Sequence, residues 1–487
     1  MSISTHLIQK NNPNLDFYIF DDSNNIPIRK YEFKNDQQNL QTCLVDEFYP
    51  EKSLRKIKNN KFNQFIEAMG FQWDTLTEPG HMRLTPYANA IMEAIEKYSW
   101  LQVTKNAKEV NVPTSKIGGG ELYDPNSLDI KNVLRDLFSG NTAYGSNYYN
   151  VKINNTVEFL RYSACTQKLS FVKTLSLDYK NLPFGLFEIS KSYRFEEEKE
   201  LQLCNRVRSF HLPELHIITD KVSSSLKIGL KIHQRMVAQI NSLGMDFEIL
   251  CNVTDSFFKK NQAFLSSFAS LLEKPFLLTV TKDNASGKDG VELDVEYKVF
   301  DCNGTPIEIS TFQVDDGSSP SAFGISYKSD ENTEKLVSTM HIVFNASVER
   351  FAYVLLNNAF INKSKLPFWA SPIQIRVIPF DKNSLHEATK LTEEMDSMNI
   401  RSELDDRDIS YTTKNADEEL AWIPYAITVK INNNQLQFVM IYCSKGEIIE
   451  KIIKKDDLMR ELRTKLNGEI NIPRYFPINL SSKIEFK

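Results

Sequence analysis

Residues 187–216 read FEISKSYRFEEEKELQLCNRVRSFHLPELH, and the alternation within this stretch decides the fold. In its first half, four apolar side chains share one parity: Phe187, Ile189, Tyr193 and Phe195. The residues between them are polar, and a period of two residues predicts a half-buried strand. After the charged turn at 197–200 the chain resumes with alternating charged and apolar residues. We therefore expect an antiparallel hairpin with one apolar and one charged face.

The charged face of this hairpin carries groups that suit a nucleotide. If the two strands share that face, Arg194, Glu196, Arg206 and Arg208 lie beside the ring of Phe210. Guanidinium groups bind phosphates, a carboxylate accepts an amine or a metal, and an aromatic ring stacks on a base. From the pattern alone, the solvated face of an ordinary hairpin is the commoner explanation.

The motif that these residues form resembles a known signature. Tyr-Arg-Phe-Glu at 193–196, followed by Arg206 and Phe210, resembles the second motif of class II aminoacyl-tRNA synthetases. The stretch NRVRSFHLPELH at 205–216 is most similar to threonyl-tRNA synthetases of the archaeal type. The resemblance implies an α+β fold, with a catalytic domain on an antiparallel sheet followed by a small α/β anticodon-binding domain. It also implies a threonine-tRNA ligase, which activates threonine with ATP and transfers it to tRNA(Thr).

Composition sets the broad limits. A chain of 487 residues, 41% of them hydrophobic, can bury two or three cores. It has neither an apolar run of membrane length nor a signal-peptide core, so we expect a cytoplasmic protein that does not enter a membrane. The six cysteines include no Cys-x-x-Cys pair, so neither a disulfide framework nor a compact zinc knuckle is indicated. The net charge of -5 excludes coating of nucleic acid by bulk charge, although local basic surfaces can still bind RNA.

Upstream of the hairpin, residues 84–113 predict a long amphipathic helix that starts at Thr85-Pro86, and then a strand at 108–113. This order resembles the first class II motif, which builds the dimer interface, so the resemblance implies a homodimer. A core helix before an edge strand explains the pattern equally well. The preceding residues 1–60 form a small N-terminal segment, too short for a large independent domain.

The second motif covers about 186–216, and the third is expected at about 339–357. There a strand runs into a helix with Arg350 in its first turn, although Asn345-Ala346 stands where small glycines are usual in the family. The catalytic domain would then span 61–365. Composition changes at KLPFWASP, and residues 366–487 are expected to form the anticodon-binding domain. Its expected elements are strands at 373–378, 425–431 and 436–441 and helices at 384–398 and 456–466.

The resemblance assigns roles to residues of these motifs. ATP-binding residues are implied at six positions: Arg194, Glu196, Arg206, Phe210, Glu308 and Arg350. Arg194 and Arg350 are the catalytic pair, because they would hold the reacting phosphates, and Glu308 is the candidate ligand of the Mg²⁺ that accompanies ATP. Three substrate-binding residues are implied near threonine and the adenylate: Glu214, Thr311 and Gln313. Catalysis would need no side-chain nucleophile, only positioning and charge stabilisation.

A metal site is also implied, with Cys165, His216 and His341 as the counterparts of the family's zinc ligands. Taken singly, a buried thiol or a hydrogen-bonded histidine is commoner, since ligands so far apart leave no spacing signature. Together they form a set that suits one zinc per subunit, with one position open for the substrate. Glu214 stands where the family usually has aspartate, so either the backbone shifts or amino acid selection changes.

Two alternatives remain open: another class II synthetase of the same subgroup, prolyl or seryl, and a non-catalytic paralogue. The presence of Arg194, Arg206 and Arg350 favours an enzyme. Full-length threonyl synthetases carry a large N-terminal editing domain, whereas only about 60 to 80 residues precede the catalytic helix here. We therefore expect no editing domain, and a separate trans-editing protein that removes serine from the tRNA.

Overall fold

The structure is a computed structural model in which the described residues fall into two compact units. One unit lies within Met1–Asn59 and Ser99–Phe351, and the other within Asn60–Tyr98 and Ala352–Lys487. The described residues are 12–21, 24–49, 60–124, 127, 148–272, 274–282, 291–315, 317–417, 422–433, 435–444, 447–466, 470, 472–474 and 476–484. Helices α4 (Pro86–Glu109) and α12 (Val348–Asn362) each run from one unit into the other.

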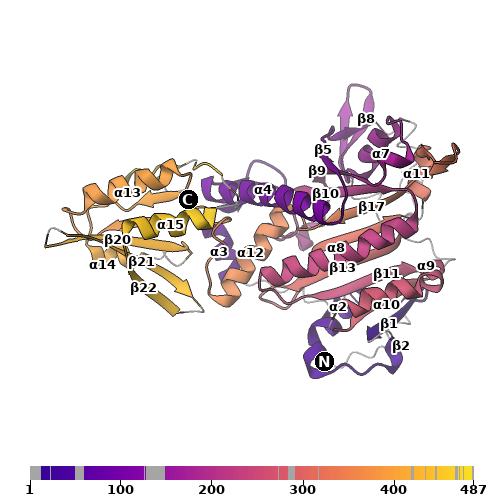
Figure 1. Ribbon diagram of the computed structural model, residues 1–487, viewed down its shortest axis with the longest axis horizontal. Helices are drawn as coiled ribbons and strands as arrows, with labels where there is room; N and C mark the ends of the chain where they lie inside the picture. Colours follow the sequence, from indigo (N-terminus) through magenta and orange to yellow (C-terminus); the bar gives the residue numbers. More distant parts are fainter. Residues whose placement is uncertain are drawn as a thin grey trace. The chain divides into compact units, whose positions relative to one another are not determined.

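The first unit is built on a ten-stranded sheet (Figure 1). Its strands are β1 (Leu15–Asp21), β2 (Asn24–Pro27), β5 (Thr114–Lys116), β9 (Phe184–Tyr193), β10 (Ser209–Thr219), β11 (Glu248–Thr254), β12 (Phe276–Thr281), β13 (Val291–Phe300), β14 (Pro306–Asp315) and β17 (Ser338–Val343). They lie in the order β2-β1-β12-β11-β13-β14-β17-β10-β9-β5. The expected antiparallel sheet is confirmed for most neighbours, but the pairs β11–β12 and β5–β9 are parallel.

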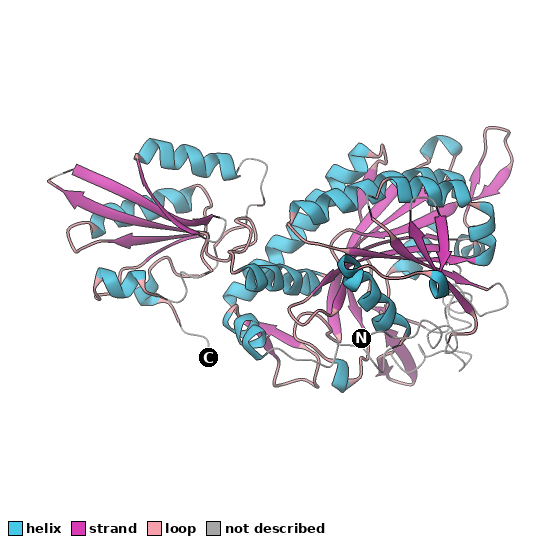
Figure 2. Ribbon diagram, turned by 90° about the horizontal axis from the view of Figure 1, so that it is seen from below, coloured by secondary structure: helices cyan, strands magenta, loops and turns pink. Residues whose placement is uncertain are grey.

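Shorter elements surround this sheet. The helices are α2 (Gln38–Phe48), α7 (Cys165–Lys173), α8 (Val222–Ser242), α9 (Asp255–Lys260), α10 (Gln262–Ser270) and α11 (Ser318–Phe323). Two small sheets are formed by β6 (Leu122–Tyr123), β7 (Asn150–Ile153) and β8 (Thr156–Leu160), and by β15 (Ser326–Lys328) and β16 (Glu334–Leu336). Figure 2 shows helices in cyan along the strands of the large sheet in magenta.

The hairpin at the centre of the sequence forms as predicted. Strands β9 and β10 are antiparallel, and Tyr193 pairs with Ser209 at the last position before the connecting loop. One expectation for its charged face is wrong. Arg208 donates from Nε and a terminal nitrogen to the backbone oxygen of Glu196, at 2.9 and 2.8 Å, and its guanidinium lies over the ring of Phe195. Arg208 therefore holds the loop and does not extend the charged face of the hairpin.

Strand alternation gives the large sheet two faces with different partners. Phe312 on β14 and Met340 on β17 pack beneath α8, where a Cβ added to Gly229 would lie 3.3 Å from the Phe312 ring. A glycine is needed there because helix and sheet approach so closely. The next residues along the two strands, Gln313 and His341, take the opposite face. That face is left for the polar site.

The small N-terminal segment is part of this sheet. Strand β1 pairs with β12, and α2 places Leu40 and Leu44 against Leu250 and Leu277 in a shared core. All four leucines are buried. Burial of one such side chain stabilises the fold by about 1.5–3 kcal/mol relative to leaving it exposed to water. The segment is thus held by apolar packing as well as by strand pairing.

The predicted long helix is confirmed as α4, which begins at Pro86, but the predicted strand at 108–113 is wrong. The helix continues to Glu109, and Asn111 then takes a left-handed conformation with φ of 58°. Asparagine tolerates this conformation better than most residues and so ends helices. Strand β5 starts only at Thr114, after the proline that the prediction had placed at its end.

The second unit contains a five-stranded α/β sheet in the order β19-β18-β20-β21-β22. Its strands are β18 (Ile375–Pro379), β19 (Ser402–Leu404), β20 (Tyr425–Asn432), β21 (Gln435–Ser444) and β22 (Glu447–Ile453). Its other elements are α3 (Asn60–Ala68), β3 (Phe71–Trp73), β4 (Met82–Leu84), α13 (Leu385–Ser397), α14 (Tyr411–Asn415) and α15 (Lys455–Leu466). All five elements predicted for 366–487 are found, whereas β19 and β22 were not predicted.

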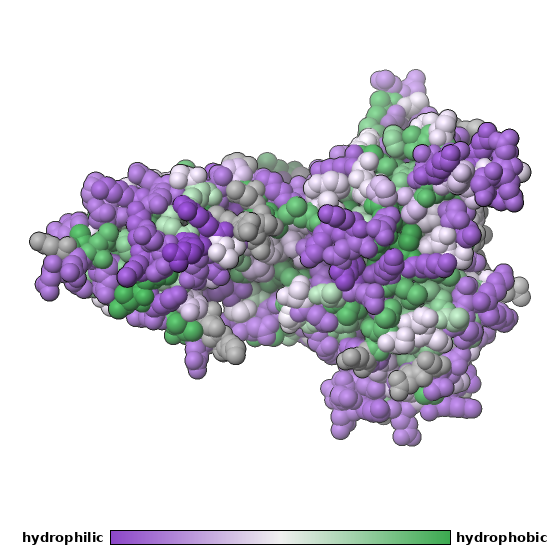
Figure 3. Space-filling model, viewed as in Figure 1, coloured by the Kyte–Doolittle hydropathy of each residue, from purple (hydrophilic) through white to green (hydrophobic). Residues whose placement is uncertain are grey.

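An apolar patch lies over the edge strand β22 in Figure 3. Two isoleucines of this strand are strongly exposed to solvent, Ile448 by 77% and Ile452 by 68%. Elsewhere this face of the unit is mostly hydrophilic in the same view. Of the helices that the structure describes, none is long and apolar enough to cross a membrane.

A buried ion pair in the five-stranded sheet gives a stability prediction. Arg376 and Glu403 are 0% and 2% exposed and form a direct ion pair. Glu403→Ala should lower the free energy of unfolding by about 3–5 kcal/mol, because a buried arginine loses its nearest carboxylate. The control is Lys382→Ala, which breaks the exposed pair with Asp408 and should change stability little. Urea unfolding of the purified variants measures both, and similar losses would contradict the expectation.

Candidate active site

The polar face of the large sheet carries a cavity of 580 Å³. Of the twelve residues to which the resemblance assigns a role, eleven line it: Cys165, Arg194, Glu196, Arg206, Phe210, His216, Glu308, Thr311, Gln313, His341 and Arg350. The twelfth, Glu214, is 0% exposed and lies in the same cluster as the cysteine and the two histidines. The structure therefore brings all twelve into one region, although they come from several distant parts of the chain.

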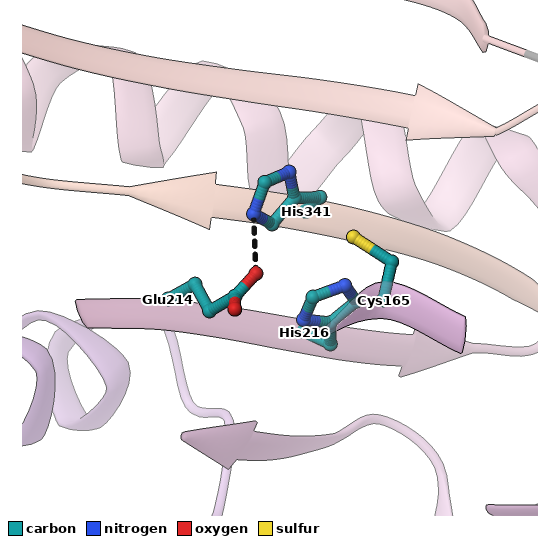
Figure 4. A group of neighbouring side chains, drawn as sticks. All are labelled: Cys165, Glu214, His216 and His341. Carbon is teal, nitrogen blue, oxygen red and sulfur yellow. Dashed lines mark ion pairs between the residues drawn. The ribbon is translucent and has the colours of Figure 1, made fainter. Parts of the chain in front are cut away.

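Four potential metal ligands meet within this region (Figure 4). Cys165 is the first residue of α7, Glu214 and His216 share a face of β10, and His341 stands opposite His216 on β17. One ligand atom from each of the four lies within 4.8 Å of the others. The rings of the two histidines are stacked with their centroids 4.7 Å apart.

Burial controls the protonation of this cluster. It lowers the pKa of His216 well below the usual range, and the neighbouring Lys168 and His341 act in the same direction. Burial and the Glu214 carboxylate raise the pKa of the Cys165 thiol to about 11. Burial also opposes ionisation of Glu214, but Lys168 and His341 hold the pKa of its carboxyl well below the usual range. The cluster thus pairs an uncharged imidazole with an ionised carboxylate.

The polar atoms of the cluster fit a metal ion. Neither ring nitrogen of His216 has a hydrogen-bond partner among the described residues. Oε2 of Glu214 and Nε2 of His341 contact each other as an ion pair at 3.0 Å (Figure 4) and have no other partner among these residues. Leaving such atoms buried and unsatisfied costs about 1–3 kcal/mol each. A cation that binds Glu214, His341 and one nitrogen of His216 removes most of this cost. Imidazole, thiolate and carboxylate are the ligands that zinc takes in proteins.

Thr311 and Gln313 on β14 both turn toward Asp294 on β13. Thr311 Oγ1 and Gln313 Nε2 donate to Asp294 Oδ1 at 3.3 and 3.2 Å, and Gln313 Oε1 lies 3.2 Å from His341 Nδ1. Gln313 thus touches the metal-ligand cluster directly. Asp294 was missed in the sequence, although charged residues of one parity in VELDVEYKVF mark a polar face on that strand.

Three arginines lie close together in the cavity wall. Arg194 is held between the rings of Tyr162 and Phe210, at 4.5 and 5.1 Å from their centroids. Arg350 donates from Nε to the backbone oxygen of Asn205 at 3.3 Å. Burial lowers the pKa of Arg350; Glu308 opposes this shift, while Arg194 and Arg206 reinforce it. Mutually repelling cations in a cavity favour a polyanion such as a triphosphate.

Arg206 is engaged by carboxylates. A terminal nitrogen of Arg206 lies 2.7 Å from Glu196 and 2.9 Å from Glu200, and its Nε donates to Glu196 at 2.8 Å. The guanidinium is 34% exposed, so its outer side remains open to the cavity. Glu196 therefore orients this arginine in addition to lining the wall.

The turn before α12 holds its arginine in place despite the unusual residues. Ala346 takes a left-handed conformation with φ of 52°, which costs a residue with a Cβ about 1–2 kcal/mol. Ser347 Oγ then accepts a hydrogen bond from the backbone N–H of Arg350 at 3.1 Å. The first turn of α12 is anchored by Glu349, which accepts from the backbone N–H and Nδ1 of His211, each at 2.9 Å. Asn345-Ala346 is accommodated, and Arg350 reaches the cavity.

Family comparisons agree with this architecture. Residues 149–359 match the tRNA synthetase class II core domain (G, H, P, S and T). Residues 374–439 match the anticodon binding domain. The sheet, the cavity and these matches define the protein as a class II aminoacyl-tRNA synthetase.

The chain is 32% identical over 453 residues to the threonine–tRNA ligase of Nanoarchaeum equitans. This match covers 92% of the present chain and 68% of the relative. It is 31% identical to the threonine–tRNA ligase of Pyrobaculum islandicum, and this match covers 93% of the present chain and 72% of the relative. The chain belongs to the threonine–tRNA ligase family, whose members use ATP to join threonine to tRNA.

A solved structure with a similar fold is titled the RNA binding domain of threonyl-tRNA synthetase from Cryptosporidium parvum. Its TM-score is 0.70 at 16% identity, and the match covers 85% of this chain and 99% of that chain. At this identity the likeness supports the fold alone.

Proposed function

We propose that threonine is activated in the cavity of the large sheet, beside a zinc ion held by Cys165, His216 and His341. The observation that carries this proposal is the buried cluster of ligand atoms without hydrogen-bond partners next to three arginines. Bound there, zinc would supply a Lewis acid for the amine and the side-chain hydroxyl of threonine.

ATP would be held by the arginines. In this proposal Arg194 binds the α-phosphate, and Arg206 and Arg350 bind the outer phosphates. The threonine carboxylate attacks the α-phosphorus and pyrophosphate leaves with its electrons; the terminal ribose hydroxyl of tRNA(Thr) then takes the threonyl group and AMP leaves. The chain contributes positioning and fixed charge, which together supply most of the barrier reduction in such transfers.

The remaining wall residues complete the site. Phe210 is proposed to stack on adenine and Glu196 to accept its amine, while Glu308 binds Mg²⁺. Thr311 and Gln313 are proposed to lie beside the adenylate, in line with their place between Asp294 and His341.

Two partners are part of the proposal. The domain at 366–487 would bind the anticodon of tRNA(Thr), in line with the family match at 374–439. Residues 84–113 would build the interface of a homodimer, from their resemblance to the first class II motif. Sedimentation of the purified chain measures whether it forms a homodimer, and a monomer at micromolar concentration would contradict this proposal.

Cys165→Ala should abolish zinc content and threonine activation together, because the cluster loses its softest ligand. Metal analysis and threonine-dependent ATP–pyrophosphate exchange measure the two. Cys302→Ser is the control, since Cys302 lies outside the four-residue cluster.

A pocket in which zinc binds the threonine hydroxyl should also activate valine roughly 10⁴-fold less efficiently than threonine, because valine lacks that hydroxyl. Full exchange activity in a zinc-free preparation would contradict the proposal.

Arg194→Ala and Arg350→Ala should each lower pyrophosphate exchange by roughly 100- to 1,000-fold, as loss of one preorganised donor to a developing charge does. The variants should stay folded, which thermal unfolding measures. Arg235→Ala is the matched control, because Arg235 lies on α8 and pairs with Glu109. Exchange at the wild-type rate in either cavity variant would refute the assigned role.

Serine should be transferred to tRNA(Thr) at a readily measured rate. Serine keeps both groups that zinc would bind and lacks one methyl, a difference of about 1–3 kcal/mol or roughly 10- to 200-fold. We propose that a separate deacylase removes it. Charging with radiolabelled serine, with and without candidate deacylases, tests this. Hydrolysis of seryl-tRNA by this chain faster than in buffer would contradict the need for a partner.

A further inference from the structure

Glu214 is held so that one carboxylate oxygen is used and the other faces the cluster. Its Oε1 accepts a hydrogen bond from Ser190 Oγ at 2.6 Å and lies 3.2 Å from Lys168 Nζ. Lys168 is itself 1% exposed, so this ion pair is fully buried. Oε2 lies 3.0 Å from His341 Nε2 and has no hydrogen-bond partner among the described residues. The carboxylate is therefore anchored on one side by Ser190 and Lys168, and on the other side it faces the histidines with His341 as its one contact among the described residues.

The orientation of the His341 ring follows from a chain of two neighbours. Asp294 can only accept, so the amide nitrogen of Gln313 must face it at 3.2 Å. The amide oxygen of Gln313 then faces His341 Nδ1 at 3.2 Å, and that nitrogen must carry the hydrogen. Nε2 is the ring nitrogen that remains to face Glu214, at 3.0 Å. Asp294 and Gln313 thus orient His341 so that this nitrogen points toward Glu214.

Two electron donors at 3.0 Å need a cation beside them. A proton shared by His341 and Glu214 would satisfy these two atoms alone. It would leave the buried ring nitrogens of His216 unsatisfied, and it would give the Cys165 thiol no role. A metal ion satisfies all four residues at once. Four ligands are also what zinc takes in closed tetrahedral sites.

We propose that Glu214 is a fourth ligand of the metal site, joining Cys165, His216 and His341. This inference rests on the proposed zinc site and adds a ligand to it. Glu214 and His216 share a face of β10, and their backbones are two residues, about 6.6–6.8 Å, apart along the strand. A side chain has to span much of that distance to reach the metal that His216 binds. The extra methylene of glutamate gives about 1.5 Å more reach than aspartate.

The fourth ligand has a consequence for substrate binding. A site with three protein ligands leaves a position open, whereas Glu214 closes it until the substrate competes. The carboxylate would then be free to accept a hydrogen bond from the amine of threonine. Ser190 and Lys168 are positioning residues in this proposal, because they fix the carboxylate through Oε1.

Zinc affinity and the visible absorption spectrum of the cobalt-substituted protein test the proposal. Glu214→Asp and Glu214→Gln should each weaken zinc binding by at least about tenfold, since loss of even an outer-shell partner costs roughly 10- to 100-fold. Both should also shift the cobalt d–d bands, which report ligand number and type. Glu214→Asp keeps the charge, so it tests reach alone even where Glu214→Gln fails to fold.

Glu188→Gln is the matched control. Glu188 pairs with Glu214 across β9 and β10 and lies 4.0 Å from Lys168, but it is not one of the four clustered residues. Its replacement should leave zinc affinity and the cobalt bands unchanged. Equal losses in the Glu188 and Glu214 variants would overturn the proposal, because they would reflect buried charge alone. So would unchanged affinity and bands in both Glu214 variants while Cys165→Ala loses its metal. Retention of zinc by Cys165→Ala would instead overturn the proposed metal site itself.

Discussion

The pairing of β10 with β17 is the constraint on which the site depends, because it sets His216 directly opposite His341. Side chains alternate between sheet faces, so this register also places Glu214 beside the histidines and Met340 beneath α8. A slip of one residue would exchange the two faces and bury the histidines under the helix. The apolar packing of α8 on Phe312 and Met340 therefore fixes the register that the polar face needs.

Elements with a strong local period could be predicted from the sequence. The hairpin, the helix from Pro86 and the elements of the second unit follow from alternation or helical spacing, which are local properties of the chain. The strand expected at 108–113 failed because one asparagine in a left-handed conformation ended the helix later than its apolar spacing suggested. The prediction that Arg208 lies on the charged face failed because side chains alternate between faces only where the strands pair, and pairing in β10 begins at Ser209. In the loop before it, each side chain is oriented by its own contacts.

The cluster could be predicted only through family resemblance, since its members lie on separate elements. Cys165 and His341 are 176 residues apart, and no spacing rule joins them. Asp294 and Lys168 were missed for a related reason. The importance of Asp294 depends on sheet order, which brings β13 next to β14. The importance of Lys168 depends on its burial on α7 beside Glu214 of β10. Local periodicity carries neither kind of information.

The site is built at the expense of stability. Arg350 has a lowered pKa because it is desolvated near two other arginines, and the His216 ring is buried with neither nitrogen hydrogen-bonded within the described structure. Buried charges of one sign and unsatisfied polar atoms both oppose folding. Such features persist where ligands offset them, as phosphates would for the arginines and a metal ion would for the cluster. The carboxylates Glu188 and Glu214 already balance Arg161 and Lys168 at short range. The atoms still without a partner among the described residues include Nε of Arg194 and the ring nitrogens of His216, and these are the two places where the proposed reaction brings in ATP and threonine.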